Sequence, residues 1–297
     1  MELGRVLTAM ATPFDREGQV DYGQAKRLSL ALLDAGSDGL VVAGTTGEAP
    51  TLSHDEKLAL FREVKAAVGD RGAVIAGTGT NNTAASIELS REAEAIGVDA
   101  LLLTAPYYSR PPQEGLFRHF QAIAAATSLP CILYNIPSRT AVNVTAATQL
   151  RLAEIPNIAG VKEASGDLDQ IAEIIEGAHD FLVWSGDDQM ALPIVAIGGY
   201  GVVGVATHLV GLQMRAMIEA QLDGRGSEAA TIHRRLLPLM KTLMTAAPNP
   251  IPLKYALNHV GFQVGGLRLP LIEADAAVAE SVVAELSRHQ IDLAVAV

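Results

Sequence analysis

Eight short apolar runs recur along this chain, and each ends in small or polar residues. They start about 28 residues apart on average, and each is apolar at successive positions, which is typical of a strand buried on both faces. The runs begin at Val6, Gly39, Ala73, Ala100, Cys131, Ile158, Phe181 and Val202. Eight is also the number of parallel strands that closes a (β/α)8 barrel.

Segments with the periodicity of a helix separate these runs, and polar residues precede three of them. Those polar residues are expected to cap the helices. The three segments are Gln24–Asp34 after Asp21, His54–Val68 after Ser53 and Ala84–Ile96 after Thr83. Alternating strands and helices predict a parallel sheet, so the expected fold is α/β, a (β/α)8 TIM barrel. An open, doubly wound sheet is the alternative.

The chain is longer than a barrel of this kind needs, which is about 250 residues. The eighth barrel helix is predicted to end near Asp223. Further helical patterns follow at Glu228–Met244, Pro252–His259 and Asp275–Arg288. We therefore expect residues 1–224 to form the barrel and its catalytic domain, and residues 225–297 to form a C-terminal helical appendage.

Charge and composition narrow the functional classes. The net charge of −11 disfavours binding to nucleic acid, and the single cysteine, Cys131, cannot form an internal disulfide. The stretch Gln189–Met214 has no charged residue and is long enough to cross a membrane, but Pro193 and several glycines interrupt it. With no signal peptide recognisable at the N-terminus, we expect a cytoplasmic protein that is not membrane-bound.

One lysine stands out from the other five. Four lie on amphipathic helical segments, where we interpret them as solvated, and Lys254 lies in the C-terminal appendage. Only Lys162 ends a buried apolar run, on the same strand face as Gly160, which leaves room for its side chain. The structural alternative is an ion pair with Glu48 or with an aspartate of segment 185–188.

The functional interpretation of Lys162 is an amine that forms imines, which requires its neutral form. A lysine with a pKa of about 10.4 is neutral in only about one molecule in 2,500 at pH 7. Burial disfavours the charged form, lowers the pKa and so raises that fraction. We therefore favour a catalytic role for Lys162 over an ion pair.

Other polar residues at the ends of the runs suit such an amine. Tyr134 shares a strand face with Ile132 and could exchange protons with an imine, or equally be a core tyrosine. Arg139 suits bidentate binding of a carboxylate, or a surface ion pair. The turn at residues 44–47 could hold a small carboxylate or simply cap the next segment. Because no His and carboxylate cluster has metal-ligand spacing, no metal is expected.

Six segments together resemble the dihydrodipicolinate synthase family of pyruvate-dependent class I aldolases. They are Gly44–Glu48 (GTTGE), Ala105–Tyr108 (APYY), Tyr134–Thr140 (YNIPSRT), Val161–Gly166 (VKEASG), Ser185–Asp188 (SGDD) and Pro248–Pro252 (PNPIP). Each is modest alone, but six in the right order along nearly the whole chain are highly specific. Arg139 favours the synthases over the related N-acetylneuraminate lyases, which lack that arginine.

The resemblance implies a lyase that condenses pyruvate with aspartate β-semialdehyde to 4-hydroxy-tetrahydrodipicolinate, the first committed step of diaminopimelate and lysine biosynthesis. It implies that Lys162 forms the Schiff base and that Tyr134 and Thr45 move protons. It implies that Tyr108 completes the relay from a neighbouring subunit of a homotetramer, a dimer of tight dimers. Substrate contacts are implied for Thr46, Arg139, Gly186 and Val203. Neither an organic cofactor nor a metal is expected.

Three other functions remain open from the residues alone. The first is another 2-keto-acid aldolase, such as an N-acetylneuraminate lyase-like enzyme. The second is a metal-dependent aldolase or isomerase, which the missing ligand set disfavours. The third is a catalytically silent barrel, because a fold by itself does not establish a function.

Family members that are inhibited by lysine have a regulatory cleft at the tight dimer interface. The equivalent positions here are Ala49, His54, Lys57, Asn81, Ala85 and Tyr107. Lysine-sensitive relatives carry His and Glu at the positions of Lys57 and Ala85. A cationic Lys57, with no carboxylate at position 85, should repel the ammonium groups of a lysine effector.

We therefore predict weak or absent feedback inhibition by lysine. The measurement is the initial rate of condensation against lysine concentration at fixed substrate. Strong, saturable inhibition at sub-millimolar lysine would contradict the prediction.

Overall fold

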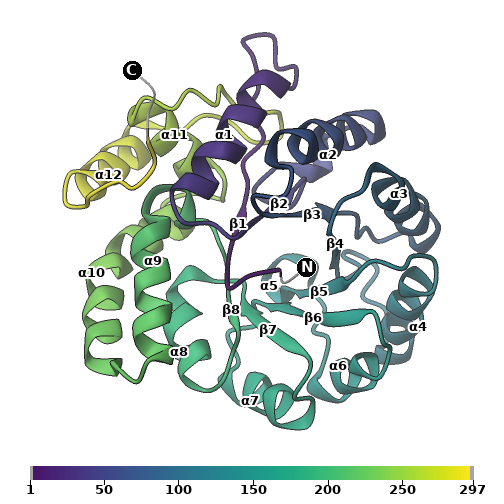
Figure 1. Ribbon diagram of the computed structural model, residues 1–297. Helices are drawn as coiled ribbons and strands as arrows, with labels where there is room; N and C mark the ends of the chain where they lie inside the picture. Colours follow the sequence, from purple (N-terminus) through teal and green to yellow (C-terminus); the bar gives the residue numbers. More distant parts are fainter. Residues whose placement is uncertain (1–2, 295–297) are drawn as a thin grey trace.

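Eight parallel strands close into a barrel in the computed structural model, which describes residues 3–294 (Figure 1). They are β1 (Val6–Ala9), β2 (Gly39–Val42), β3 (Ala73–Gly77), β4 (Ala100–Thr104), β5 (Cys131–Asn135), β6 (Ile158–Glu163), β7 (Leu182–Ser185) and β8 (Gly201–Gly204). The strands run in sequence order, and β1 pairs with β8, so the predicted (β/α)8 barrel is confirmed and the open sheet is wrong.

Helices connect the strands, and the longer ones surround the barrel on its outside (Figure 1). They are α1 (Tyr22–Asp34), α2 (His54–Val68), α3 (Thr83–Ile96), α4 (Gln113–Ala124), α5 (Pro137–Thr140), α6 (Ala146–Ala153), α7 (Leu168–Gly177), α8 (Ala191–Ala196) and α9 (Thr207–Leu222), with short 3-10 helices η1 (Ala49–Thr51) and η2 (Asp188–Met190). The uncharged stretch 189–214 spans the end of η2, α8, β8 and the start of α9. Among the described residues, no helix is both long and apolar enough to cross a membrane.

Two of the three predicted helix caps form as expected. The Asp21 side chain accepts a hydrogen bond from the third residue of α1, and Ser53 and Glu56 form a reciprocal capping box on α2. The predicted cap of α3 is wrong, because the helix already includes Thr83 and Asn82 caps it. The Thr83 hydroxyl instead hydrogen-bonds to Nδ1 of His119 on α4, at 2.9 Å.

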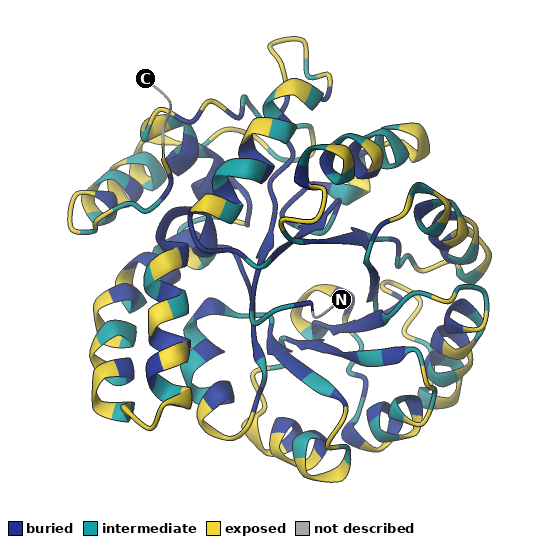
Figure 2. Ribbon diagram, in the orientation of Figure 1, coloured by how far each residue is buried: buried dark blue, intermediate teal, exposed yellow. Residues whose placement is uncertain are grey.

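The apolar side chains form two layers, because successive residues of a strand point to opposite faces. One cluster fills the barrel interior and includes Ile132, Tyr134 and Trp184. The other lies between the strands and the helices. Figure 2 shows buried strands at the centre and exposed residues on the outer faces of the helices. Polar groups at the strand ends are therefore held by a rigid, fully packed wall.

Three helices follow the barrel, namely α10 (Gly226–Thr245), α11 (Ile251–His259) and α12 (Ala276–Leu286), close to the predicted segments. Helix α10 packs along α9, and α12 packs on α10 and α11 (Figure 1). The predicted boundary after residue 224 falls between α9 and α10, and the division into two domains stays a prediction. Residues 1 and 297, its predicted ends, lie outside the described part of the chain.

Candidate functional site

Lys162 and Tyr134 lie side by side at the ends of β6 and β5. The parallel register places Tyr134 directly opposite Lys162, and Nζ of the lysine lies 4.3 Å from the centroid of the tyrosine ring. Both residues are buried, with exposed fractions of 5% and 4%. The alternation of side chains along each strand thus brings the two residues together inside the barrel, as the sequence predicts.

Room for the lysine side chain comes from a different glycine than predicted. A Cβ atom on Gly160 would meet the carbonyl oxygen of Leu182 first and would lie 2.9 Å from the Trp184 ring, so Gly160 makes space for the neighbouring strand β7. A Cβ atom on Gly186 would lie 3.0 Å from Cγ of Lys162. Gly186 is therefore the residue that clears the lysine stem, and its N–H is already used, donating to the Glu163 carbonyl at 2.7 Å.

Burial changes the acidity of Lys162. The pKa of the ammonium is lowered to about 8, mainly by loss of hydration; the charge of Asp188 opposes this shift and the charge of Arg139 adds to it. With a pKa of about 8, about one molecule in ten is neutral at pH 7, compared with about one in 2,500 for a free lysine. The geometry therefore supplies a reactive amine near neutral pH.

The negative charge of Asp188 favours the protonated form of the Lys162 amine. The Asp188 carboxylate accepts hydrogen bonds from the N–H groups of Val205 and Ala206, each at 3.0 Å, while burial raises its pKa to about 6. The alternative ion pair between Lys162 and Glu48 is wrong, because Glu48 pairs with Lys254. In residues 3–294, no three His, Cys, Asp or Glu side chains are grouped as a metal site requires.

Tyr134 carries a phenol that stays protonated at neutral pH. Burial raises its pKa to about 12, although contact with the Thr45 side chain and the charge of Arg139 both act in the opposite direction. A protonated phenol can donate a hydrogen bond or a proton to a group on the adjacent amine. Thr45, on the turn after β2, is placed to take part in that transfer.

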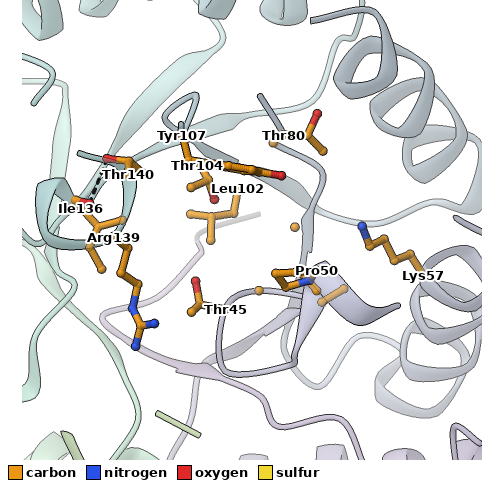
Figure 3. A pocket seen from close by; sticks show the side chains of 15 residues that line it. Thr45, Pro50, Lys57, Thr80, Leu102, Thr104, Tyr107, Ile136, Arg139 and Thr140 are labelled. Atoms are coloured by element: carbon orange, nitrogen blue, oxygen red, sulfur yellow. Dashed lines mark hydrogen bonds between the residues drawn. The ribbon is translucent and has the colours of Figure 1, made fainter. Parts of the chain in front are cut away.

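A cavity of about 380 Å³ opens beside these residues (Figure 3). Thr45 and Arg139 line it, and Figure 3 shows the Arg139 side chain extending toward Thr45. Ala49, Lys57 and Tyr107 line the same cavity, whereas Lys162 and Tyr134 do not. Arg139, implied for substrate binding, thus shares one cavity with residues equivalent to a lysine-effector site.

The other residues implied for substrate binding are buried near the strand ends. Thr46 is 2% exposed, and its hydroxyl accepts a hydrogen bond from Nδ2 of Asn249 at 2.9 Å. The hydroxyl proton of Thr46 is therefore free to be donated to another acceptor. Val203, on β8, belongs to the apolar cluster of the barrel interior.

Several predicted positions lie apart from this centre. Tyr108 is 90% exposed with a φ of +76°, so the single chain does not bring it to Lys162. His54 forms an ion-pair contact with Glu92 at 2.7 Å. Asn81 and Ala85 are exposed and do not line the cavity.

The sequence interpretation of Lys57 is wrong, because this lysine, expected to be solvated, is half-buried and lines the cavity. Burial also lowers the pKa of Lys57. Lys254, which the sequence analysis placed in the C-terminal appendage without a role, is 1% exposed and paired with Glu48. The signal for Lys254 was available in the sequence, since the lysine interrupts the apolar pattern of its helix, whereas its partner Glu48 lies far away along the chain.

The chain is similar to known proteins over nearly its whole length. Residues 2–289 match the dihydrodipicolinate synthetase family. The chain is 61% identical to the 4-hydroxy-tetrahydrodipicolinate synthase of Moorella thermoacetica, over 96% of this chain and 98% of that protein. It is 57% identical to the 4-hydroxy-tetrahydrodipicolinate synthase of Dehalococcoides mccartyi, over 98% of each.

Solved structures give the same picture. A dihydrodipicolinate synthase from Bacillus anthracis superposes with a TM-score of 0.94 at 45% identity, covering 97% of this chain and 98% of that one. A dihydrodipicolinate synthase from Cyanidioschyzon merolae, solved with lysine bound, has a TM-score of 0.94 at 45% identity and covers 96% and 98%. A monomeric dihydrodipicolinate synthase variant has a TM-score of 0.93 at 38% identity and covers 96% and 97%.

The lowered pKa of Lys162 predicts a pH dependence for imine formation. Since only the neutral amine attacks a carbonyl, the rate of imine formation with pyruvate should rise from pH 6 and level off above a pH of about 8. The measurement is a brief exposure to pyruvate at each pH, a borohydride quench at one fixed pH, and mapping of the modified peptide. A rate that keeps rising beyond pH 10 would show an ordinary lysine and contradict the prediction.

Proposed function

Because the chain belongs to the dihydrodipicolinate synthetase family, we propose that Lys162 is the amine through which it joins pyruvate to aspartate semialdehyde. Its activity is that of a 4-hydroxy-tetrahydrodipicolinate synthase, a lyase of the Schiff-base class I aldolase type in diaminopimelate and lysine biosynthesis. The N-acetylneuraminate lyase-like alternative is not favoured. The observation that carries the role of Lys162 is its burial beside the ring of Tyr134.

The covalent steps follow from a neutral amine. Lys162 attacks the carbonyl carbon of pyruvate, and loss of one water from the resulting carbinolamine gives the imine. Loss of a methyl proton then gives an enamine, whose terminal carbon attacks the aldehyde of the second substrate. The amine of that substrate next replaces Lys162 at the imine carbon, which closes the ring and frees the lysine.

These steps move protons at Lys162, at the methyl carbon of pyruvate and at the new hydroxyl. The centroid of the Tyr134 ring lies 4.3 Å from the amine, and the high pKa of its phenol means that it recovers its proton readily. Thr45 contacts Tyr134 and lines the cavity, so it links the phenol to the substrate side. We assign these two residues to the proton relay.

Binding of the two substrates uses separate groups. Pyruvate needs a donor for its carboxylate close to Lys162, and the Thr46 hydroxyl can provide one, while Gly186 and Val203 are proposed to contact the bound pyruvate through other atoms. Arg139, in the wall of the cavity, suits the carboxylate of aspartate semialdehyde. All charges and protons in this scheme are handled by side chains and backbone, so we propose a reaction without metal or organic cofactor.

Tyr108 is proposed to act in a neighbouring subunit. Its side chain is almost fully exposed, and its left-handed backbone holds it away from its own chain. Non-glycine residues seldom adopt this backbone conformation, and a solvated tyrosine gains nothing that would offset its cost. Insertion of the exposed side chain into a partner subunit would offset that cost. We propose a homotetramer, a dimer of tight dimers, in which each Tyr108 completes the relay of its partner.

Loss of Lys162 should abolish condensation. Turnover of pyruvate with aspartate semialdehyde is followed as NADPH oxidation through the reductase that consumes the product. In Lys162→Ala, kcat should fall by at least about 10³-fold, because the covalent route is lost. Lys241→Ala, on the exposed face of α10, is the matched control and should keep the wild-type rate.

Two results would overturn this assignment. Turnover that survives in Lys162→Ala would exclude the imine at that residue. A folded wild-type protein without any turnover would favour a 2-keto-acid lyase, with Arg139 reassigned to a structural role.

Subunit complementation tests the role of Tyr108. Lys162→Ala and Tyr108→Phe subunits are inactive or weak alone, and they are mixed after mild dissociation and reassembly. If Tyr108 acts in the partner, each mixed dimer contains one site with an intact Lys162 and an intact Tyr108, and activity should rise toward half of the wild-type value per mixed dimer. If mixed dimers, verified by native mass spectrometry, show no gain, Tyr108 does not act across an interface.

A further inference from the structure

The turn that carries Thr45 and Thr46 is held in a conformation that it would not adopt alone. We call residues 43–48 the relay turn. Ala43 and Glu48, at its two ends, have φ values of +54° and +57°. Non-glycine residues adopt this left-handed conformation only where their surroundings enforce it. Residues 249–268, which follow the barrel, supply a large part of those surroundings.

Three sets of contacts, which we call braces, hold the relay turn in place, and the first is an ion pair buried from solvent. Oε1 of Glu48 lies 2.6 Å from Nζ of Lys254 on α11, and the two side chains are 0% and 1% exposed. The same Nζ donates to the Gly266 carbonyl at 2.7 Å and lies 4.1 Å from the centroid of the Phe14 ring. The free energy needed to remove two charges from water offsets much of their mutual attraction. The main contribution of such a pair is therefore a fixed geometry.

The second brace uses the other oxygen of the same carboxylate. Oε2 of Glu48 accepts a hydrogen bond from the backbone N–H of Arg268 at 3.0 Å. The Arg268 guanidinium in turn donates two hydrogen bonds to Glu56, at 2.8 and 2.6 Å, in the first turn of α2. It also donates to the carbonyl of Thr51 at 3.0 Å. Glu48 thus contacts the C-terminal segment directly and is connected through Arg268 to the start of α2.

The third brace reaches the turn next to Thr45. Nδ2 of Asn249 donates to the Thr46 hydroxyl at 2.9 Å, and both residues are buried. From the barrel side, the hydroxyl of Thr12 donates to the Gly47 carbonyl at 2.7 Å. The relay turn therefore has almost no freedom to shift while these contacts are made, and Thr45 keeps its contact with Tyr134.

We propose that Glu48 is a positioning residue for the reaction, which holds the Thr45 hydroxyl against Tyr134 through its buried contacts with Lys254 and Arg268. The inference rests on the proposed function of Thr45 and deepens it. Glu48 has both carboxylate oxygens engaged and does not line the cavity. Glu48 therefore acts through the relay turn. Because its partners are Lys254 and Arg268, the C-terminal segment also has a role in turnover.

A double-mutant cycle on kcat distinguishes this role from a merely structural one. Glu48→Gln keeps the shape of the side chain but removes its charge, and at saturating substrates it should lower kcat by about tenfold to a hundredfold, the loss expected for a displaced catalytic group. Thr45→Val removes the hydroxyl directly. If Glu48 acts through that hydroxyl, the double variant should be no slower than Thr45→Val within about twofold, since coupled groups are not additive. Effects on kcat that multiply would overturn the proposal.

Two further variants control for folding. If Glu48→Gln leaves Lys254 as an unpaired buried charge and fails to fold, Glu48→Gln combined with Lys254→Met removes both charges and should give a folded enzyme with the same loss of kcat. Wild-type kcat in that variant would overturn the proposal. Asp99→Asn breaks the ion pair with Lys65 (2.8 Å) before β4, at the other end of the barrel, and should lower stability but leave kcat unchanged.

The failure of this inference is distinguishable from failure of the proposed function. A wild-type enzyme that neither turns over nor forms the borohydride-trapped imine on Lys162 would overturn both. A wild-type enzyme that does both, with multiplicative effects in the cycle, would overturn only the role of Glu48.

Discussion

Lys162 loses its hydration when β6 packs into the barrel wall, and this loss lowers the pKa of its ammonium to about 8. The remaining features of the site depend on that step. Asp188 limits the shift, and its hydrogen bonds to the N–H groups of Val205 and Ala206 tie the ends of β7 and β8 together. Tyr134 can lie against the amine only because the β5–β6 register places it directly opposite.

A rigid amine needs a proton relay that is equally well placed, and one member of the proposed relay, Thr45, lies on a turn rather than on a strand. Turns are more mobile than the strands they follow. Here the turn carries positive φ values at Ala43 and Glu48, and buried polar contacts from the C-terminal segment offset the cost of that conformation. Residues after the barrel thus restrict the motion of a turn that the barrel strands alone leave more mobile.

The sequence predicted what depends on local patterns. Periodicity located all eight strands and identified Lys162 and Tyr134 as polar residues near the ends of two of them. It failed where a distant partner decides the outcome. Thr83 was predicted to cap α3, but its hydroxyl has a partner in His119 on another helix. The pairing of Lys254 with Glu48 was not predicted, because two residues some two hundred positions apart share no periodic pattern in the sequence.

Charge presents the last constraint, because both substrates carry carboxylates and the chain has a net charge of −11. A uniformly acidic surface would slow the approach of such anions. Arg139 and Lys57 line one cavity, and Lys162 lies buried beside it, so the local potential opposes the net charge of the chain. This accounts physically for a cationic side chain at position 57. Within a shared cavity, a charge that attracts the anion pyruvate would also oppose the binding of an effector with two ammonium groups.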